Sequence, residues 1–252
     1  MPDSIDGRVQ REREQYDKGL ERDLYTRIFA GGYFYRRQSE ELLKEHLRYA
    51  NGRRALELGS HFWIRCIDGF GIQPRELECI NISERELQRG IDAAKASRVK
   101  PRFTLMDANQ LKFPDESFDI VFGKAILHHL DLARALSEIR RVLKPQGRIV
   151  FSEPLGVNPV AKLVRLMTPQ ARTTDEQPLR KQELASIEEQ FDTTFHYQQF
   201  FSVPVGVLSN VLRFPPDNQL MKWAYEMDTF IEGKIPPARI LYRLVIIVGT
   251  RR

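Results

Sequence analysis

Three apolar segments of the chain each end at a side chain that can hydrogen-bond a ligand, and a fourth is followed by two histidines. The three side chains are Glu57, Asn81 and Asp107, and the histidines are His128 and His129. The carboxyl ends of parallel strands meet at one edge of a sheet, and open α/β folds bind their ligands there. Imidazole titrates near neutral pH and can accept a proton from a reacting group. The spacing therefore predicts one ligand site with acid–base groups beside it.

The segments that carry these residues alternate between strand and helix patterns. Apolar runs predict five strands, at residues 53–58, 77–82, 102–106, 118–123 and 148–152. Between them, Ser83 with Glu86 three positions later is typical of a capping box, and Asp131 stands where it can cap a helix that ends before Pro145. Strands that alternate with amphipathic helices indicate right-handed crossovers and a doubly wound, mostly parallel, Rossmann-like α/β sheet.

Further segments flank this core, and together they indicate one domain over residues 1–252. Residues 1–50 are predicted to form an N-terminal helical cap, in which Ser39 fits an N-cap position. Residues 51–153 form the ligand-binding core. Residues 154–252 add the last strands and the long segments between them.

The C-terminal part contributes two more strands, at 193–202 and 241–250, which makes a seven-stranded sheet. The connections 154–190 and 204–240 are long for a compact fold. Connections of that length are usually binding loops or lids, so we interpret them as lid insertions after strands five and six.

Composition and charge restrict the classes of function. The 252 residues are 42% hydrophobic and 29% charged, and the net charge of +5 is not gathered in a basic run that could follow a nucleic-acid backbone. Cys66 and Cys79 match no metal motif and are expected to be reduced thiols. The N-terminus is too rich in charge for a signal peptide, and no stretch reaches the roughly 18 apolar residues that span a bilayer. We expect a cytoplasmic protein with no transmembrane segment, metal or nucleic-acid partner.

Six short motifs follow one another in a specific order. They are Leu56-Glu57-Leu58-Gly59, Asn81-Ile82-Ser83-Glu84, Met106-Asp107-Ala108, Phe113-Pro114-Asp115-Glu116-Ser117-Phe118-Asp119, Ile126-Leu127-His128-His129-Leu130 and Val142-Leu143-Lys144-Pro145-Gln146-Gly147. One such motif is a weak signal, whereas six in this order and spacing are specific. Over residues 50–155 the chain resembles the class I S-adenosylmethionine-dependent methyltransferases. The resemblance implies S-adenosylmethionine as cofactor and S-adenosylhomocysteine as product.

The resemblance also implies a set of cofactor-binding positions. Glu57 and Gly59 are implied beside the methionine part of the cofactor, where a carboxylate can hold the ammonium group and a glycine lets the backbone approach. Asp107 is implied to accept a hydrogen bond from the adenine amino group, with Ala108 beside it. The full expected set is Glu57, Gly59, Ser60, His61, Asn81, Ile82, Asp107, Ala108 and Lys124.

Two positions depart from the family's pattern. Further glycines normally follow Gly59, but here residues 60–63 read Ser-His-Phe-Trp. Phe62 and Trp63 either contact the ligand or turn inward and fill space beneath the first crossover. The second strand ends in Asn81 instead of an acid that binds the ribose hydroxyls, which gives up a charge-assisted hydrogen bond about twice as strong as a neutral one. The cofactor site is therefore weakened, reshaped or lost.

The expected catalytic groups follow strands four and five. In this fold the loop after strand four lies beside the sulfonium, so His128 and His129 are the leading candidates for a base, with a buried structural histidine as the alternative for one of them. Glu153 ends strand five. It either holds a substrate hydroxyl, orients a histidine or caps a helix.

Three further residues are predicted to contact the substrate. Tyr16 and Tyr33 could cover the pocket, although the helical spacing of Tyr16 also suits a core position. Arg172 could bind an anionic substrate group in a bidentate manner. Alternatively it pairs with Asp175 or Glu176, which the sequence favours.

The hypothesis with the most support is an enzyme that transfers a methyl group from S-adenosylmethionine to a small acceptor. The aromatic residues of the C-terminal third suit a partly apolar natural product, lipid or sugar, and they would also suit a homodimer face. The alternative is a binding protein that keeps the fold and has lost catalysis through the changed loop. A nucleic-acid methyltransferase is disfavoured, because Gly123-Lys124-Ala125-Ile126 stands where such enzymes carry a polar residue, two prolines and an aromatic residue.

Overall fold

The computed structural model describes residues 5–21, 23–28, 33–215 and 217–252. Within these residues, a seven-stranded sheet has the order β3-β2-β1-β4-β5-β7-β6, and all neighbours are parallel except those that pair with β7. The strands are β1 (Arg54–Leu58), β2 (Glu76–Asn81), β3 (Arg102–Leu105), β4 (Phe118–Lys124), β5 (Leu143–Pro154), β6 (Phe191–Gln198) and β7 (Leu244–Arg251). The predicted Rossmann-like, mostly parallel sheet is confirmed.

The strand order reverses between β1 and β4, and this reversal determines where a ligand site can form. β1 pairs with β2 on one side and with β4 on the other. Connections that leave neighbouring strands toward opposite directions open a crevice at the carboxyl ends of those strands. Leu58 of β1 lies opposite Gly123 of β4 at this end. The segments that follow both strands therefore border the same crevice.

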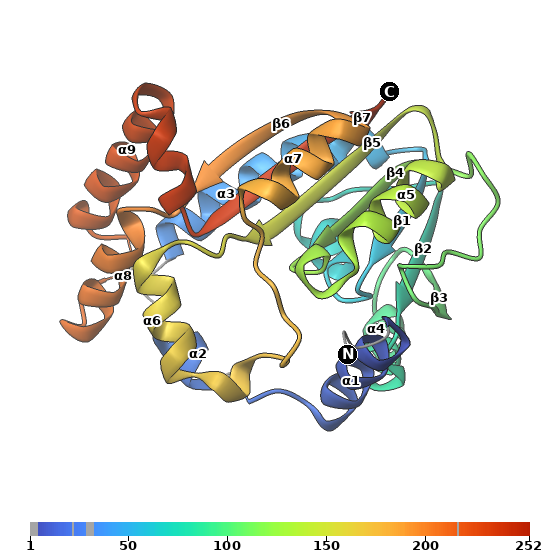
Figure 1. Cartoon of the computed structure of the whole chain (residues 1–252), viewed down its shortest axis with the longest axis horizontal. Helices are drawn as coiled ribbons and strands as arrows, with labels where there is room; N and C mark the ends of the chain where they lie inside the picture. Colours follow the sequence, from blue (N-terminus) through green and yellow to red (C-terminus); the bar gives the residue numbers. More distant parts are fainter. Residues whose placement is uncertain (1–4, 22, 29–32, 216) are drawn as a thin grey trace.

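Helices cover both faces of the sheet (Figure 1). They are α1 (Ile5–Lys18), α2 (Asp23–Ile28), α3 (Tyr33–Leu47), α4 (Glu84–Ala94), α5 (Leu132–Val142), α6 (Pro159–Met167), α7 (Lys181–Gln190), α8 (Ser202–Val211) and α9 (Gln219–Lys234). One apolar cluster includes Leu136 of α5 and Ile187 of α7. A second includes Leu43 of α3 and Trp63. The regular apolar spacing of these helices thus corresponds to the faces that they bury against the sheet.

Two of the three predicted helix starts are confirmed. Ser83 Oγ accepts from the Glu86 amide at 3.2 Å, and Asp131 Oδ1 accepts from the Arg134 amide at 3.1 Å. The prediction for Ser39 is wrong, because α3 begins at Tyr33 and holds Ser39 in its interior. The Ser39 hydroxyl instead donates to the side chain of Gln198 at the end of β6. A partner far away in the sequence explains why the local capping signal was misleading.

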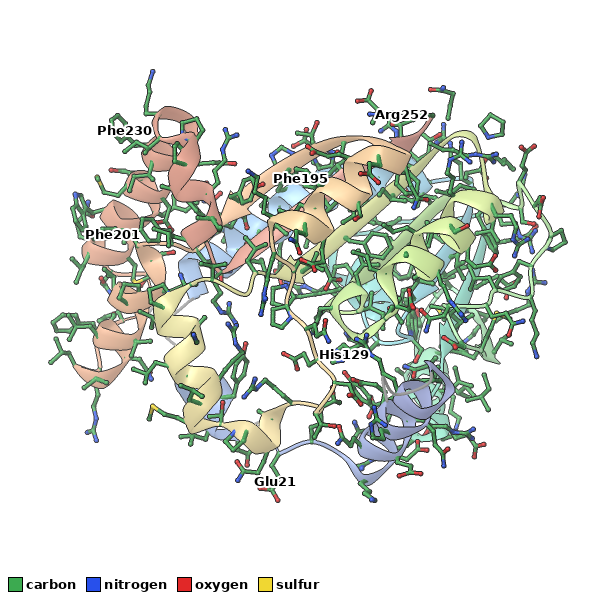
Figure 2. All side chains as sticks on the ribbon, in the orientation of Figure 1. Glu21, His129, Phe195, Phe201, Phe230 and Arg252 are labelled. Carbon is green, nitrogen blue, oxygen red and sulfur yellow. The ribbon has the colours of Figure 1, made fainter. Side chains whose placement is uncertain are left out.

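The two long connections contain helices. α6 and α7 lie between β5 and β6, whereas α8 and α9 lie between β6 and β7. In Figure 1, α6, α8 and α9 gather at one end of the sheet, on the left of the view, and Figure 2 shows the same end with its side chains, Phe201 and Phe230 among them. Within the described part of the chain, none of the helices is both long and apolar enough to cross a bilayer.

Gly90 allows α4 to approach the loop that follows β1. A Cβ atom at Gly90 would lie 2.8 Å from the Ser60 carbonyl oxygen and 2.6 Å from the Phe103 ring. We expect Gly90→Ala to lower the free energy of unfolding by about 1–3 kcal/mol despite the higher helix propensity of alanine. The control is Gly233→Ala in α9, where nothing lies within 4 Å of an added Cβ, so a neutral or slightly stabilising effect is expected. Equal effects of the two changes in urea unfolding would contradict the close packing of α4.

Candidate active site

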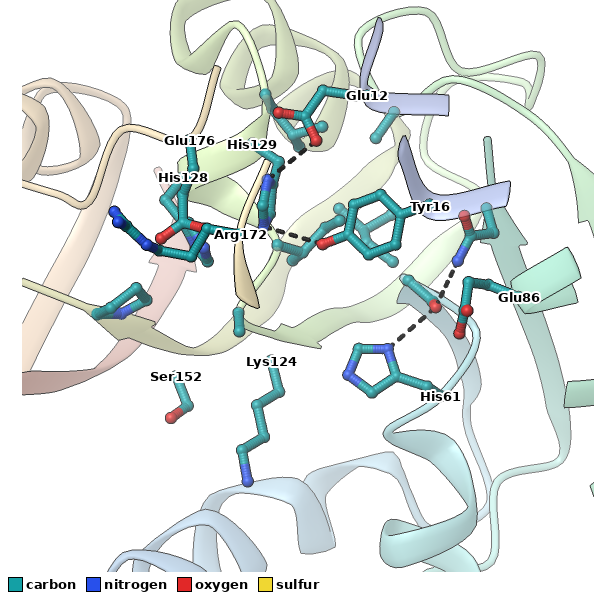
Figure 3. Close-up of a pocket in the computed structure, with 18 of the residues that line it drawn as sticks. Glu12, Tyr16, His61, Glu86, Lys124, His128, His129, Ser152, Arg172 and Glu176 are labelled. Carbon is teal, nitrogen blue, oxygen red and sulfur yellow. Dashed lines mark hydrogen bonds and ion pairs between the residues drawn. The ribbon is translucent and has the colours of Figure 1, made fainter. Parts of the chain in front are cut away.

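A pocket of about 610 Å³ opens along the carboxyl ends of the central strands (Figure 3). Its volume lies within the roughly 300–1,000 Å³ of small-molecule sites. One half is lined by residues at or after the ends of β1, β2 and β3 and by the last residue of β4, namely Gly59, His61, Asn81, Ile82, Glu86, Asp107, Ala108, Asn109 and Lys124. The other half is lined by α1, the loop after β4 and the long connections, namely Glu12, Tyr16, His128, His129, Arg165, Arg172, Glu176 and Arg243. Most of the predicted site residues thus face one cavity, and Glu57, Ser60 and Glu153 lie behind its wall.

Glu57 holds the loop that follows β1 in place. Its side chain is fully buried, and Oε1 accepts from the backbone amides of His61 at 3.1 Å and Phe62 at 2.8 Å. Burial raises the pKa of Glu57, although the charge of His61 and these two hydrogen bonds oppose the shift. The carboxylate is therefore turned toward the loop backbone and not toward the pocket, which differs from the predicted position beside the methionine group.

Asn81 clamps the same loop from β2. Its Nδ2 donates to the Gly59 carbonyl oxygen at 2.7 Å and to Ser60 Oγ at 3.1 Å, and its Oδ1 accepts from the Ser83 amide at 2.9 Å. Gly59 has φ 112° and Ser60 has φ 55°. Both lie in the left-handed region, which favours glycine and costs a residue such as Ser60 roughly 1–2 kcal/mol. The amide of Asn81 stabilises this strained turn, and that role explains an amide where the family has an acid.

The aromatic residues of the loop turn into the core. Trp63 is fully buried, and its ring centroid lies 5.8 Å from that of Phe103. The ring centroid of Phe62 lies 6.5 Å from that of Phe122. The alternative in which Phe62 and Trp63 turn inward and fill space beneath the crossover is the one that the structure supports. Of this loop, His61 is the side chain that reaches the pocket, with Nδ1 3.1 Å from the Gly59 carbonyl oxygen.

The segment after β3 forms the far wall of the same half. Asp107 Oδ1 accepts from the Asn109 amide at 2.8 Å, and Asn109 Oδ1 accepts from the Asp131 amide at 3.0 Å. These bonds fix the turn and place Asp107 and Ala108 along the pocket. Ile82 lines the pocket from the end of β2. The arrangement can hold a flat polar ring between an apolar wall and a carboxylate.

His128 is held by a buried carboxylate. Glu153 is fully buried, its Oε2 lies 2.7 Å from His128 Nδ1, and its Oε1 accepts from the amides of Ile126 at 2.9 Å and Leu127 at 3.0 Å. Burial raises the pKa of Glu153 to about 7, and the backbone hydrogen bonds oppose that shift. Of the predicted roles for Glu153, this geometry matches orientation of a histidine.

His129 is surrounded by groups from distant segments. Its Nε2 lies 3.0 Å from the Tyr16 hydroxyl, and its Nδ1 lies 3.2 Å from Glu12 Oε2 and 3.3 Å from Thr173 Oγ1. Thr173 also donates to Glu12 at 2.6 Å. Sequence reasoning missed Glu12 and Thr173. The signal for Glu12 was its position one helical turn before Tyr16, which places both on the same face of α1.

The pKa of His129 is lowered from its ordinary value of 6.5, because burial and the neighbouring His128 outweigh the carboxylate of Glu12. We expect the His129 ring to titrate below pH 6.5 in a ¹³C–¹H NMR titration. His129→Gln identifies the resonance. Because the lowered pKa makes protonation easier in the unfolded chain, the native state loses stability as the pH falls below 6.5. A His129 ring that titrates above pH 6.5 would contradict this expectation, because the carboxylate of Glu12 would then outweigh burial and His128.

The predicted substrate contacts have mixed outcomes. Tyr16 and Arg172 line the pocket. Tyr33 begins α3, but its side chain lies outside the described part of the structure. The expected partner Asp175 pairs with Arg11 at 2.8 Å, so it does not neutralise Arg172. Sequence reasoning missed the other arginines of the pocket, because no local pattern distinguishes them.

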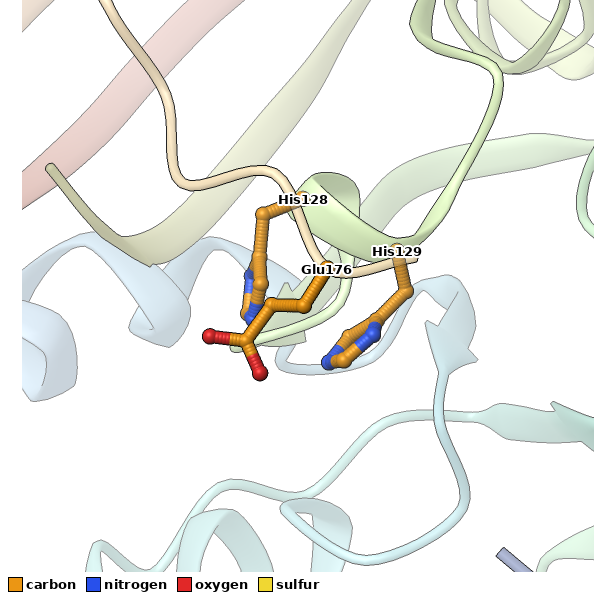
Figure 4. Close-up of side chains that lie close together, drawn as sticks. All are labelled: His128, His129 and Glu176. Atoms are coloured by element: carbon orange, nitrogen blue, oxygen red, sulfur yellow. The ribbon is translucent and has the colours of Figure 1, made fainter. Parts of the chain in front are cut away.

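His128, His129 and Glu176 form a group of the kind that can bind a metal ion. One potential ligand atom from each lies within 4.8 Å of the others (Figure 4). A divalent ion with bonds of about 2.0–2.2 Å would need donors roughly 3–3.5 Å apart. Both ring nitrogens of His129 already contact protein groups. We therefore interpret these three residues as a polar cluster in which the two imidazole rings lie 4.1 Å apart and the charge of His129 acts on Glu176.

Comparison with known proteins identifies similar chains. A family model described as a methyltransferase domain matches residues 59–151. The chain is 30% identical over 170 residues to a demethylmenaquinone methyltransferase of Symbiobacterium thermophilum, with 66% of each chain covered. It is 32% identical over 87 residues to a glycine/sarcosine/dimethylglycine N-methyltransferase of Actinopolyspora halophila, which covers 33% of this chain and 15% of that relative. The matched segment is thus a small part of the second relative.

A solved structure with a similar fold covers nearly the whole chain. It is a geranyl diphosphate C-methyltransferase of Streptomyces coelicolor A3(2) in complex with Mg²⁺, geranyl diphosphate and S-adenosyl-L-homocysteine. The TM-score is 0.61 at 15% sequence identity, with 94% of this chain and 84% of that chain covered. At this identity the likeness shows the fold. The proteins in these comparisons methylate different acceptors, so the acceptor does not follow from similarity.

Proposed function

Because the chain belongs to the class I S-adenosylmethionine-dependent methyltransferases, we propose that it transfers a methyl group from this cofactor to a small, partly apolar acceptor. A natural product, lipid or sugar would suit the pocket. The observation that carries the proposal is the continuity of the pocket, which runs from Asp107 past Gly59 to His128. Cofactor positions and base candidates therefore share one cavity.

The residues of the first half suit the cofactor. Gly59 presents bare backbone at φ 112°, and a Cβ there would lie 3.3 Å from the His61 ring. Asp107 would accept a hydrogen bond from the adenine amino group, with Ile82 and Ala108 on the faces of the ring. Lys124 and His61 would lie at the methionine end. The bound cofactor supplies the electrophilic methyl group, and the chain supplies position and exclusion of water.

His128 is the base in this proposal. Both ring nitrogens of His129 are occupied by Tyr16, Glu12 and Thr173, so His129 holds α1 against the pocket. His128 Nδ1 forms a hydrogen bond with Glu153, and the His128 side chain lines the cavity. Glu153 fixes its ring so that it can take the proton from the acceptor's nucleophilic atom. The long connections form the lid over that acceptor.

Calorimetric titration with S-adenosylhomocysteine tests the cofactor site. We expect Asp107→Ala to weaken binding by about 1–3 kcal/mol, because the adenine amino group loses its acceptor in a buried place. Asp115→Ala removes an exposed carboxylate elsewhere and is expected to bind like the unaltered protein. Unchanged affinity of Asp107→Ala would remove Asp107 from the adenine role. If the unaltered protein gave no heat at millimolar ligand, the hypothesis of a non-catalytic binding protein would have more support.

A further inference from the structure

Three arginines line the half of the pocket that is remote from the expected cofactor positions. Arg165 comes from α6, Arg172 follows it in the same connection, and Arg243 directly precedes β7. In Figure 3, Arg172 lies near His128 and Glu176 to the left of Tyr16, whereas Glu86 lies to its right and His61 below it. We call Arg165, Arg172 and Arg243 the arginine subsite.

Arg165 and Arg172 donate their hydrogen bonds to neutral oxygens. Arg165 donates to the Gly156 carbonyl oxygen at 3.1 Å, and Arg172 donates to the carbonyl oxygen of Arg165. Arg243 donates to the side chain of Gln199 and, at 2.6 Å, to the Tyr25 hydroxyl. Arg172 Nε is buried and has no hydrogen-bond partner among the described residues. Among the residues that the structure describes, neither Arg165 nor Arg172 belongs to an ion pair.

The charge balance of the subsite is positive. Arg165 feels the charges of Arg172 and Arg243, with Glu176 as the carboxylate that opposes them. Burial raises the pKa of Glu176, which further weakens it as a counter-ion. Burial likewise lowers the pKa of Arg165, and Arg172 adds to that shift. Arg165 and Arg172 thus act on each other, both are half-buried, and neighbouring charges of one sign in such a place are unfavourable unless a ligand compensates them.

We propose that the arginine subsite binds a phosphate or diphosphate group carried by the methyl acceptor. This inference rests on the proposed methyl transfer and names the class of its substrate. A phosphate group carries about −1.5 to −2 charges at neutral pH and three strong acceptor oxygens, so it can engage more than one guanidinium group at once. The planar forks of Arg165 and Arg172 are suited to its oxygens. With the phosphate held there, the rest of the acceptor extends toward His128.

Calorimetric titration with inorganic pyrophosphate at constant ionic strength tests the subsite. We expect the unaltered protein to bind it, and Arg172→Gln and Arg165→Gln to weaken binding at least tenfold. Arg172→Lys keeps the charge but loses the fork, so an intermediate loss is expected. Arg75→Gln removes one positive charge from an exposed surface position and is expected to change nothing. Thermal unfolding of each variant establishes that it is folded.

The same samples are titrated with S-adenosylhomocysteine. Variants that no longer bind pyrophosphate but still bind S-adenosylhomocysteine support the proposal. Pyrophosphate binding that none of the subsite changes affects would overturn it, as would binding of benzoate in preference to pyrophosphate. If Arg172→Gln weakened S-adenosylhomocysteine as strongly as pyrophosphate, the subsite would belong to the cofactor's carboxylate and the proposal would fail. Failure of the unaltered protein to bind S-adenosylhomocysteine would instead contradict the proposed function.

Discussion

Glu57→Ala is expected to lower the free energy of unfolding by about 2–5 kcal/mol, the largest effect of any change considered for this chain. Glu57 Oε1 accepts from the amides of His61 and Phe62, and alanine leaves the buried amide of Phe62 and the partly buried amide of His61 without an acceptor. Each such orphaned group costs about 1–3 kcal/mol. Because the loop then loses its fixed shape, S-adenosylhomocysteine should also bind more weakly. Urea unfolding and calorimetric titration measure the two effects.

Glu57→Gln distinguishes hydrogen-bond acceptance by this side chain from its negative charge. Its amide oxygen can still accept from the loop, and burial already raises the pKa of Glu57, so the uncharged side chain should keep most of the stability. Glu84→Ala removes an exposed carboxylate from α4 and is expected to cost less than about 0.5 kcal/mol. If Glu57→Ala were as stable as Glu84→Ala, the loop would not depend on this carboxylate.

Asn81→Asp restores the acid that the family carries at the end of the second strand, yet we expect it to be harmful. Asn81 Nδ2 donates to the Gly59 carbonyl oxygen at 2.7 Å and to Ser60 Oγ at 3.1 Å, and a carboxylate would place an acceptor against the carbonyl oxygen. We expect a loss of about 2–4 kcal/mol in the free energy of unfolding and weaker binding of S-adenosylhomocysteine.

Asn51→Asp is the matched control, because Asn51 uses its Oδ1 to accept from the Gln73 amide at 2.7 Å, and aspartate can do the same. That change should leave stability within about 0.5 kcal/mol. Tighter binding of S-adenosylhomocysteine by Asn81→Asp would mean that position 81 contacts the ribose, and the clamp described for Asn81 would then be secondary.

Local patterns were sufficient to predict the fold. The alternation of apolar runs and capped helices indicated a doubly wound, mostly parallel sheet, because right-handed crossovers leave few ways to connect such strands. The same patterns placed Asn81, Asp107 and His128 at strand ends. Parallel strands bring such ends to one edge, so their common cavity could be expected before the structure was known.

The contacts that could not be predicted join residues far apart in the chain. Glu12 reaches His129 at 3.2 Å from α1, and Ser39 reaches Gln198 from the middle of α3. Sequence spacing carries no information on such pairs. The directions of side chains on one loop were also ambiguous, because turning Phe62 inward or outward is decided by the space beneath the crossover. A single sequence does not reveal that space.

A crystal structure with S-adenosylhomocysteine tests the central claim most directly. We expect the nucleoside to lie along the carboxyl ends of β1, β2 and β3, with adenine beside Asp107 and the sulfur atom facing His128. Phe62 and Trp63 should remain in the core. A structure in which either aromatic side chain occupies the nucleoside position, or in which the ligand binds elsewhere, would contradict it.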